Sequence, residues 1–318
     1  MSIKKTLKIT LVVLFSLLVL FFLTGAIIFF KFPSVLMNLN TQNERSAANL
    51  EFHELQIEKL KWAYLDSKDT GKETVVLVHG FGLSKDLWGE LPKNLKEYRI
   101  IAMDLPGFGE SGTIDADGYN LPDQAAWLDQ FLTRLNPGKV NLVGFSLGGG
   151  IAARYAARYP EKIKSLVLID AFGAAVENSE FDLLYNKGEN YMLFRTAEEY
   201  DRMALYGFHN PPPPLPEPFR KEIAAIASSR YDYNKKLFDG MIRSGKNFVI
   251  EDLPKIKSPT LIVWGKNDRM INLSAGAEFN KGIKGSKLVV IPEAGHMVYM
   301  EKPAEVIKAL KDFWKANQ

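Results

Sequence analysis

The segment Gly144-Phe145-Ser146-Leu147-Gly148 holds a serine in a spacing that supports nucleophilic chemistry. The apolar run at residues 140–143 precedes it and the small-residue run at residues 149–157 follows it, so a strand should lead into the segment and a helix should leave it. Such a tight turn lifts the serine hydroxyl clear of the sheet, and its glycines let strand and helix approach closely. The backbone N–H of Leu147, at the start of the helix, can then stabilise an oxyanion. Ser146 is the candidate nucleophile.

The same pattern also occurs by chance in glycine-rich loops, so its partners matter. A serine hydroxyl needs a base, and the base needs an orienting carboxylate. Of the four histidines, His53 falls in an expected early strand, His209 lies beside a proline run, and His79 precedes Gly-Phe-Gly, where it suits shaping a loop. His296 follows Gly295 just past the last expected strand. It is the candidate base, because active-site groups gather beyond the carboxyl ends of strands in open α/β sheets.

Two aspartates follow expected strands and could orient the histidine. Asp268 comes just after the penultimate strand, and the chain order Ser146, Asp268, His296 is the one expected for a nucleophile on such a turn. Asp170 ends the strand before an insertion and is the rival. Either aspartate could instead be an ordinary turn residue. We favour Asp268 as the acid, because it and His296 should lie on adjacent loops.

A second oxyanion donor should come from the loop after the strand at residues 75–78. The backbone N–H of Phe81 is the candidate, because Gly80 and Gly82 let the backbone approach a substrate closely. Loss of one such donor typically costs about 2.7–4 kcal/mol of transition-state stabilisation. Phe81 and Leu147 are therefore the expected oxyanion hole.

The composition excludes several classes of protein. The 318 residues include no cysteine, which excludes disulfides, thiolate catalysis and cysteine-based zinc sites. The net charge of +3 is too small to argue for nucleic-acid binding. The chemistry expected of the serine, histidine and aspartate needs neither a metal nor a cofactor.

The N-terminus predicts a membrane anchor over residues 1–31. Residues 9–30 carry no charge and are mostly Leu, Val, Ile and Phe. Roughly 20 apolar residues can cross a bilayer as a helix, whereas a signal peptide has an apolar region of only about 7–15 residues. A cleaved signal is the first alternative. A buried core helix is the second, disfavoured because apolar residues cover every face.

The flanking lysines predict how the anchor is oriented. Lys4, Lys5 and Lys8 precede the apolar run and Lys31 follows it. The short N-terminus should then be cytoplasmic and the main body periplasmic or extracellular. Residues 32–50, in which Asn and Gln are frequent, are expected to be a polar tether.

Apolar runs alternate with helical patterns through most of the chain. The expected strands lack polar alternation, as in a parallel sheet covered on both faces: residues 75–78, 99–103, 140–143, 166–169, 261–264 and 288–291. Helical patterns cover residues 121–135, 149–159, 274–280 and 303–314. The alternation predicts an α/β fold with a doubly wound, mostly parallel sheet. Residues 53–66 should add one or two antiparallel strands.

The alternation breaks once, between residues 171 and 257. Helix-prone stretches at residues 181–191, 196–206 and 219–229 replace the strands, and the proline run at residues 211–214 should be stiff and extended. We expect a helical cap here, with about half of its aromatic side chains facing a pocket. The core then consists of two parts, residues 51–170 and 258–318.

These motifs resemble the α/β-hydrolase family from about residue 51 onward. The matching segments are residues 79–82 (His-Gly-Phe-Gly), 104–111 (Asp-Leu-Pro-Gly-Phe-Gly-Glu-Ser) and 144–148, together with Asp268 and His296. With its anchor the chain also resembles the ABHD6-like monoacylglycerol lipases and related membrane-associated bacterial lipases. In this family the cap lines the substrate pocket. Haloalkane dehalogenases and typical epoxide hydrolases are disfavoured, because they have aspartate where this chain has serine.

The resemblance implies a membrane-anchored serine esterase or lipase acting on carboxylic esters of medium- or long-chain acyl lipids, with no metal, cofactor or nucleic acid as partner. Two alternatives stay open. A carbon–carbon bond hydrolase or an acyltransferase of the same fold would share the residues Ser146, Asp268 and His296. A non-catalytic ligand-binding module is disfavoured, because all three residues are present.

Overall fold

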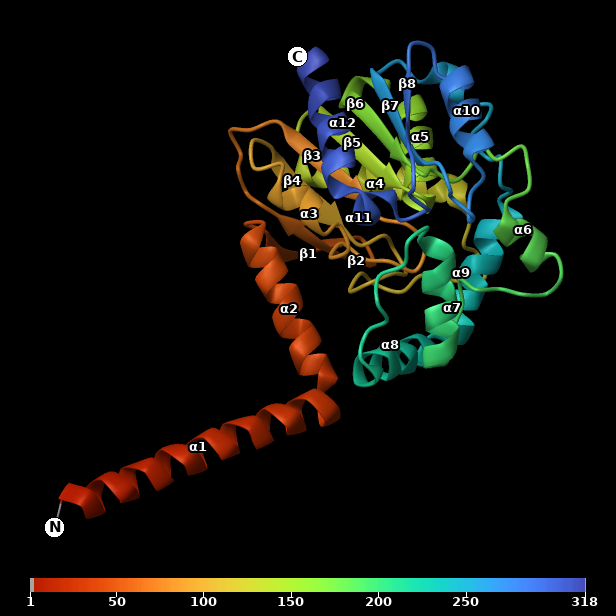
Figure 1. The fold of residues 1–318 in the computed structure, drawn as a ribbon. Coiled ribbons are helices and arrows are strands. Elements are labelled where there is room, and N and C mark those ends of the chain that lie inside the picture. The colour runs from red at the N-terminus through yellow and green to blue at the C-terminus, as the bar shows by residue number, and fades with distance from the viewer. Residues whose placement is uncertain (1–2, 318) are drawn as a thin grey trace.

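A computed structural model of the chain describes residues 3–317, and within that part an eight-stranded sheet lies at the centre (Figure 1). The strand order is β1-β2-β4-β3-β5-β6-β7-β8. Strands β3 to β8 run parallel, and β2 pairs antiparallel with β1 and β4. The strands are β1 (Glu51–Ile57), β2 (Leu60–Asp66), β3 (Thr74–Val78), β4 (Arg99–Met103), β5 (Val140–Phe145), β6 (Ile163–Ile169), β7 (Thr260–Gly265) and β8 (Lys287–Ile291). The predicted mostly parallel sheet is confirmed.

Helices cover both faces of the sheet, which is why its central strands are apolar throughout. Every residue of β3, β5 and β7 is buried. One face is covered by α4 (Leu121–Leu135), α5 (Leu147–Arg158) and α10 (Leu273–Gly282); the other by α3 (Glu90–Lys93), α11 (Val298–Glu301) and α12 (Pro303–Ala316). The two apolar cores lie between the sheet and these helices.

The strand order aligns the candidate site residues along one edge of the sheet. The chain places β4 on one side of β3 and β5 on the other. Such a reversal is where open α/β sheets bind ligands, beyond the carboxyl ends of the strands. The loops that follow β3, β5, β6, β7 and β8 carry, in that order, Phe81, Ser146, Asp170, Asp268 and His296.

The insertion after β6 forms a group of helices beyond this edge (Figure 1). They are α6 (Glu180–Tyr185), α7 (Ala197–Gly207), α8 (Glu217–Ser229) and α9 (Tyr231–Arg243). α6 is shorter than the predicted helix, because residues 186–188 form a turn in which Gly188 takes a φ of +88°. α9 was not predicted. It buries Leu237, Phe238 and Met241 on one face.

The N-terminal apolar helix is present as α1 (Ile3–Lys31), which projects away from the sheet (Figure 1). Among the described residues, its span Lys5–Lys31 is the one helix long and apolar enough to cross a membrane. None of its most apolar stretch is buried against the protein.

The segment expected to be a tether is instead a helix that binds the core, α2 (Pro33–Ala47). Arg45 donates two hydrogen bonds to the carboxylate of Asp86, at 2.6 and 2.8 Å. Such a bidentate pair fixes orientation as well as distance. Just after the helix, Ala48 and Leu50 are buried. Arg45 therefore fastens α2 to the core, within the segment whose Asn and Gln content had suggested a tether.

Asp86 belongs to an ion-pair network around the buried Lys85, in the loop that follows β3. The Lys85 side chain is 1% exposed and contacts Asp104 at 2.9 Å and Glu110 at 2.5 Å. Burial alone would lower the pKa of Lys85, but Asp104 and the other carboxylates raise it above its usual value. A buried charge needs such pairing. The network gives a structural role to the motif at residues 104–111, whose Gly109 has no room for a Cβ beside Asp104.

Candidate active site

Ser146 lies on a tight turn between β5 and α5, with φ 52° and ψ −122°. A non-glycine residue in this region is strained and persists only where its surroundings fix it. The Ser146 carbonyl accepts the N–H of Phe172 at 2.8 Å. The flanking glycines are required: a Cβ on Gly144 would lie 2.4 Å from the Gly148 oxygen, and one on Gly148 would lie 2.2 Å from the Val78 oxygen.

The three residues predicted as nucleophile, base and acid lie in one hydrogen-bonded chain. Nε2 of His296 is 3.0 Å from Oγ of Ser146, and its Nδ1 is 2.8 Å from Oδ2 of Asp268. The His296 and Asp268 side chains are 5% and 0% exposed. The other Asp268 oxygen accepts the N–H groups of Met270 and Ile271, which orients the carboxylate. This arrangement can accept the serine proton and stabilise the resulting imidazolium.

Asp170, the rival acid, lies beside this chain but outside it. Its Oδ1 accepts the N–H of Gly265 at 2.8 Å, and the residue is fully buried. A carboxylate oxygen of Asp170, a carboxylate oxygen of Asp268 and a ring nitrogen of His296 all lie within 4.8 Å of one another. Burial, and then the charge of Asp268, raise the pKa of Asp170 well above its ordinary value. Asp170 holds the end of β7 through this hydrogen bond, and its raised pKa favours the neutral form beside Asp268.

The two predicted oxyanion donors belong to backbone segments that meet at Ser146. Leu147 is the first residue of α5, where N–H groups have no intrahelical partner. The segment before Phe81 lies in close contact with the turn at Ser146, because a Cβ on Gly80 would lie 3.0 Å from Cβ of Ser146. The Phe81 ring is buried and packs edge-on against Phe238 of the cap, which fixes the loop.

The other histidines have different positions. His79 is buried, and its Nδ1 lies 2.7 Å from the Gly80 oxygen while its Nε2 accepts the N–H of Leu105 at 2.9 Å. Burial lowers the pKa of His79 below its usual value. The neutral ring therefore shapes the loop, as the sequence indicated. His53 lies on β1 and His209 in the cap.

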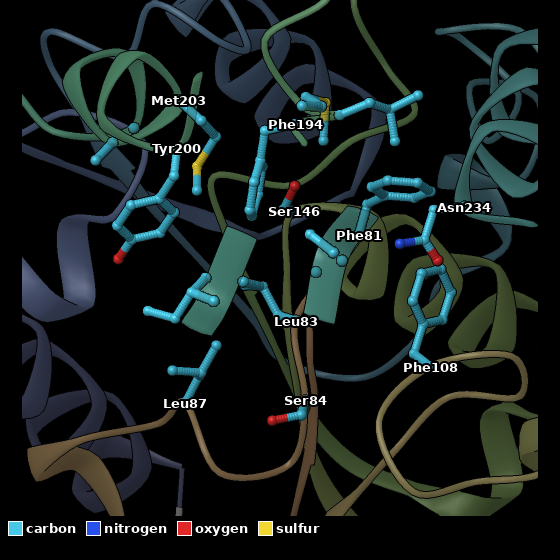
Figure 2. Close-up of a pocket in the computed structure, with 18 of the residues that line it drawn as sticks. Phe81, Leu83, Ser84, Leu87, Phe108, Ser146, Phe194, Tyr200, Met203 and Asn234 are labelled. Atoms are coloured by element: carbon cyan, nitrogen blue, oxygen red, sulfur yellow. The ribbon is translucent and has the colours of Figure 1, made fainter. Parts of the chain in front are cut away.

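An apolar cavity of about 480 Å³ lies between the cap and the loop after β3, and Ser146 and His296 line it. Figure 2 shows Ser146 beside Phe194 and Phe81, with Leu83 and Leu87 on the loop side and Met203 on the cap side. A second cavity of about 50 Å³ also reaches Ser146 and His296.

Six aromatic residues of the predicted cap differ in what their rings contact. Phe194 lines the larger cavity, and Phe172 and Phe181 line the smaller one. The remaining three pack against other rings: Tyr185 on Phe238, Tyr191 on Tyr206 and Phe219 on Phe29. Three of these six residues therefore face one of the two cavities, and Phe194 alone among them faces the larger one.

Comparisons with known proteins agree with this architecture. The chain is 28% identical over 307 residues to monoacylglycerol lipase abhd6-A of Xenopus laevis, covering 91% of this chain and 90% of that protein. It is 28% identical over 286 residues to lipase 1 of Psychrobacter immobilis, covering 87% and 89%. The crystal structure of a membrane phospholipase A, described as a bacterial virulence factor, matches with a TM-score of 0.85 and 32% identity, over 96% of this chain and 98% of that one.

A more distant structure shares the fold alone. The meta-cleavage product hydrolase of Pseudomonas fluorescens matches with a TM-score of 0.71 at 20% identity. The family profile for the alpha/beta hydrolase fold matches residues 73–303. That match covers well over half of the chain and includes the tight turn at Ser146, the cap and the loops that carry Asp268 and His296. The chain belongs to the α/β-hydrolase family.

Proposed function

We propose that this chain is a membrane-anchored serine hydrolase that cleaves carboxylic esters of acyl lipids, acylglycerols among them, through an acyl-enzyme on Ser146. The broader class, carboxylic ester hydrolase, follows from the family and from relatives named as lipases. The observation that carries the finer proposal is the hydrogen-bonded chain from Asp268 through His296 to Ser146, at the wall of an apolar cavity.

In the proposed reaction, Oγ of Ser146 attacks the ester carbonyl carbon while Nε2 of His296 takes its proton. Asp268 keeps the proton on Nδ1 of the histidine and stabilises the imidazolium. The backbone N–H groups of Phe81 and Leu147 donate to the oxyanion. The bond to the leaving alcohol then breaks, and His296 returns the proton to that oxygen. His296 then takes a proton from water as the water oxygen attacks the acyl carbon; the bond from that carbon to Oγ of Ser146 breaks, His296 returns the proton to Oγ, and the fatty acid leaves.

The position of the anchor supports a lipid substrate. Helix α8 contributes Ile223 and Ile226 to the cavity. The same helix lies against the junction of α1 and α2, where the rings of Phe219 and Phe29 are 5.4 Å apart (Figure 1). With α1 embedded in a bilayer, α8 and the cavity would lie close to the lipid surface. The lysines before the anchor would place the catalytic domain on the non-cytoplasmic side.

A substrate panel tests the function itself. We expect turnover of p-nitrophenyl esters and of monoacylglycerols, with fatty acid as product, and no turnover of diketone acids. Labelling by a fluorophosphonate would separate an active serine hydrolase from a binding module. Turnover of diketone acids alone would instead make the chain a carbon–carbon bond hydrolase.

The cap side chains should set the acyl-chain preference. Met203→Trp fills part of the larger cavity, and Phe194→Ala enlarges it. Each buried methylene contributes about 0.8 kcal/mol, so Met203→Trp should lower kcat/KM for a dodecanoyl ester by about tenfold relative to a butyryl ester. Chain-length profiles of kcat/KM measure this. Tyr191→Ala is the control, since that ring stacks on Tyr206. Superimposable profiles for all variants would mean that the cap does not select the chain.

Truncation separates the anchor from α2. Deletion of residues 1–31 should move the enzyme from the membrane fraction to solution and preserve hydrolysis of p-nitrophenyl butyrate, because none of the described residues of α1 belongs to the triad or lines the cavity. Deletion of residues 1–48 should also lower the thermal midpoint, because it removes Arg45 and leaves Asp86 without its bidentate partner. The proposed anchor would be contradicted if the protein lacking residues 1–31 failed to fold, or if the full-length protein were soluble without detergent.

A further inference from the structure

One carboxylate fastens the loop that carries His296 to the cap. Glu301 lies at the end of α11. Its Oε1 accepts the N–H of Gly295 at 2.7 Å and that of His209 at 3.1 Å. Its Oε2 accepts the N–H groups of His209 at 3.0 Å and Asn210 at 2.9 Å. Gly295 precedes the candidate base directly, whereas the other two donors belong to the cap.

The two segments that share Glu301 are also packed backbone against backbone. We call residues 207–210 the cap strap and residues 294–297 the histidine loop. The N–H of Met297 donates to the oxygen of Gly207 at 2.9 Å. A Cβ on Gly295 would lie 2.6 Å from the backbone nitrogen of His209. Because the segments are in such close contact, the strap cannot move without either breaking these hydrogen bonds or moving the loop.

The cap-strap side supplies two of the three donors to this carboxylate. Hydrogen bonds from backbone N–H groups to a carboxylate are charge-assisted and stronger than neutral ones. If the strap moves away, Glu301 keeps only the N–H of Gly295. The histidine loop then loses both this link and the bond from Met297 to Gly207.

We propose that Glu301 is a positioning residue that couples the seating of the cap to the position of His296. We call the hydrogen bonds that Glu301 accepts from Gly295, His209 and Asn210 the clamp. With the cap seated, the clamp holds the histidine loop where Nε2 of His296 lies 3.0 Å from Oγ of Ser146. With the strap displaced, the base is no longer held in line with its nucleophile. The kinetic part of this inference rests on the proposed function.

The kinetic test compares Glu301→Ala and Glu301→Gln with Glu305→Gln, a matched change at an exposed carboxylate of α12. The substrate is p-nitrophenyl acetate, which needs few cap contacts. A misplacement of catalytic groups by 1 Å can cost on the order of a hundredfold, so kcat should fall at least about tenfold in Glu301→Ala with KM nearly unchanged. Glu301→Gln keeps one acceptor oxygen and should lose less. Glu305→Gln should match the wild type.

A second variant perturbs the clamp from the cap side. Asn210→Pro removes the N–H that reaches Oε2 of Glu301, at a position already followed by prolines. Hydrogen exchange measured by mass spectrometry should be faster over residues 294–297 in both Asn210→Pro and Glu301→Ala than in the wild type. This measurement needs no activity, so it decides the clamp even if the wild type proves to hydrolyse no ester.

Two results would overturn the inference. One is a hydrogen-exchange rate over residues 294–297 that equals the wild-type rate in both Asn210→Pro and Glu301→Ala. The other is a Glu301→Ala enzyme that has only a lower thermal midpoint, with wild-type kcat below that temperature, since a merely structural carboxylate would behave in that way.

Discussion

Ser146→Ala should lower kcat for ester hydrolysis by several orders of magnitude, toward the scale of about 10⁶ found on removing a triad nucleophile in another serine hydrolase. The serine oxygen lies 3.0 Å from Nε2 of His296. Alanine leaves that nitrogen with no hydroxyl to activate, so no acyl-enzyme can form. The measurement is kcat with a soluble ester, together with the thermal midpoint of both proteins.

The fold should survive this change. The turn is fixed by backbone contacts, such as the Phe172 N–H to the Ser146 oxygen, and alanine retains them. Ser84 also lines the cavity and provides a control, because Ser84→Ala should retain activity. If Ser146→Ala keeps more than a tenth of the wild-type kcat with an unchanged midpoint, Ser146 is not the nucleophile.

Asp268→Asn should lower kcat at neutral pH by at least about a hundredfold, and a triad change of this kind has cost about 10⁴ elsewhere. The Asp268 carboxylate accepts from Nδ1 of His296 and from the N–H groups of Met270 and Ile271. Asparagine preserves the shape but can present its amide to the ring, which then takes the wrong tautomer. Circular dichroism should first confirm that the variant is folded.

Asp170→Asn should lower kcat less than tenfold in the same assay. Burial and the neighbouring Asp268 raise the pKa of Asp170, which favours the neutral carboxyl that asparagine resembles. The amide oxygen can still accept the N–H of Gly265. The reverse order of effects would assign the acid role to Asp170, and equal severe losses would mean that the two aspartates share it.

The raised pKa of Asp170 also predicts how stability depends on pH. The folded state binds a proton that the unfolded state releases above the ordinary carboxyl pKa. Stability contributed by this group is therefore present below that pKa and is lost as pH rises toward the raised value. Asp170→Asn removes this dependence. Its thermal midpoint relative to the wild type should therefore increase as the pH is raised from the carboxyl range to neutrality.

The sequence predicted the sheet well because strands that are buried on both faces appear in it as continuous apolar runs. The run at residues 99–103 is β4 to the residue, and the helix at residues 121–135 is α4, capped by the Asn120 side chain. The candidate site was predicted because each group directly follows a strand, and parallel strands align their carboxyl ends. Four histidines allowed elimination, and the structure puts His79 and His296 where their neighbouring residues indicated.

Features that depend on distant partners were not visible in the sequence. The polar composition of α2 gave no sign that this segment contacts the core. The contact depends on the ion pair between Arg45 and Asp86, which lies far along the chain. α9 was not predicted although Leu237, Phe238 and Met241 recur at helical spacing, because Gly240 lies inside the run. Its glycine is needed where the helix packs, since a Cβ there would lie 2.4 Å from the Tyr119 oxygen. Glu301 had no sequence signal, because its partners are backbone N–H groups.

The most direct test of the central claim is to map a fluorophosphonate adduct by mass spectrometry on the full-length protein in detergent. The proposed chemistry predicts stoichiometric modification of Ser146 in the wild type, much slower modification when His296 is replaced by alanine, and none in Ser146→Ala. An unmodified wild-type protein, or an adduct on another residue at the same rate in Ser146→Ala, would contradict the assignment of Ser146 as the nucleophile activated by His296.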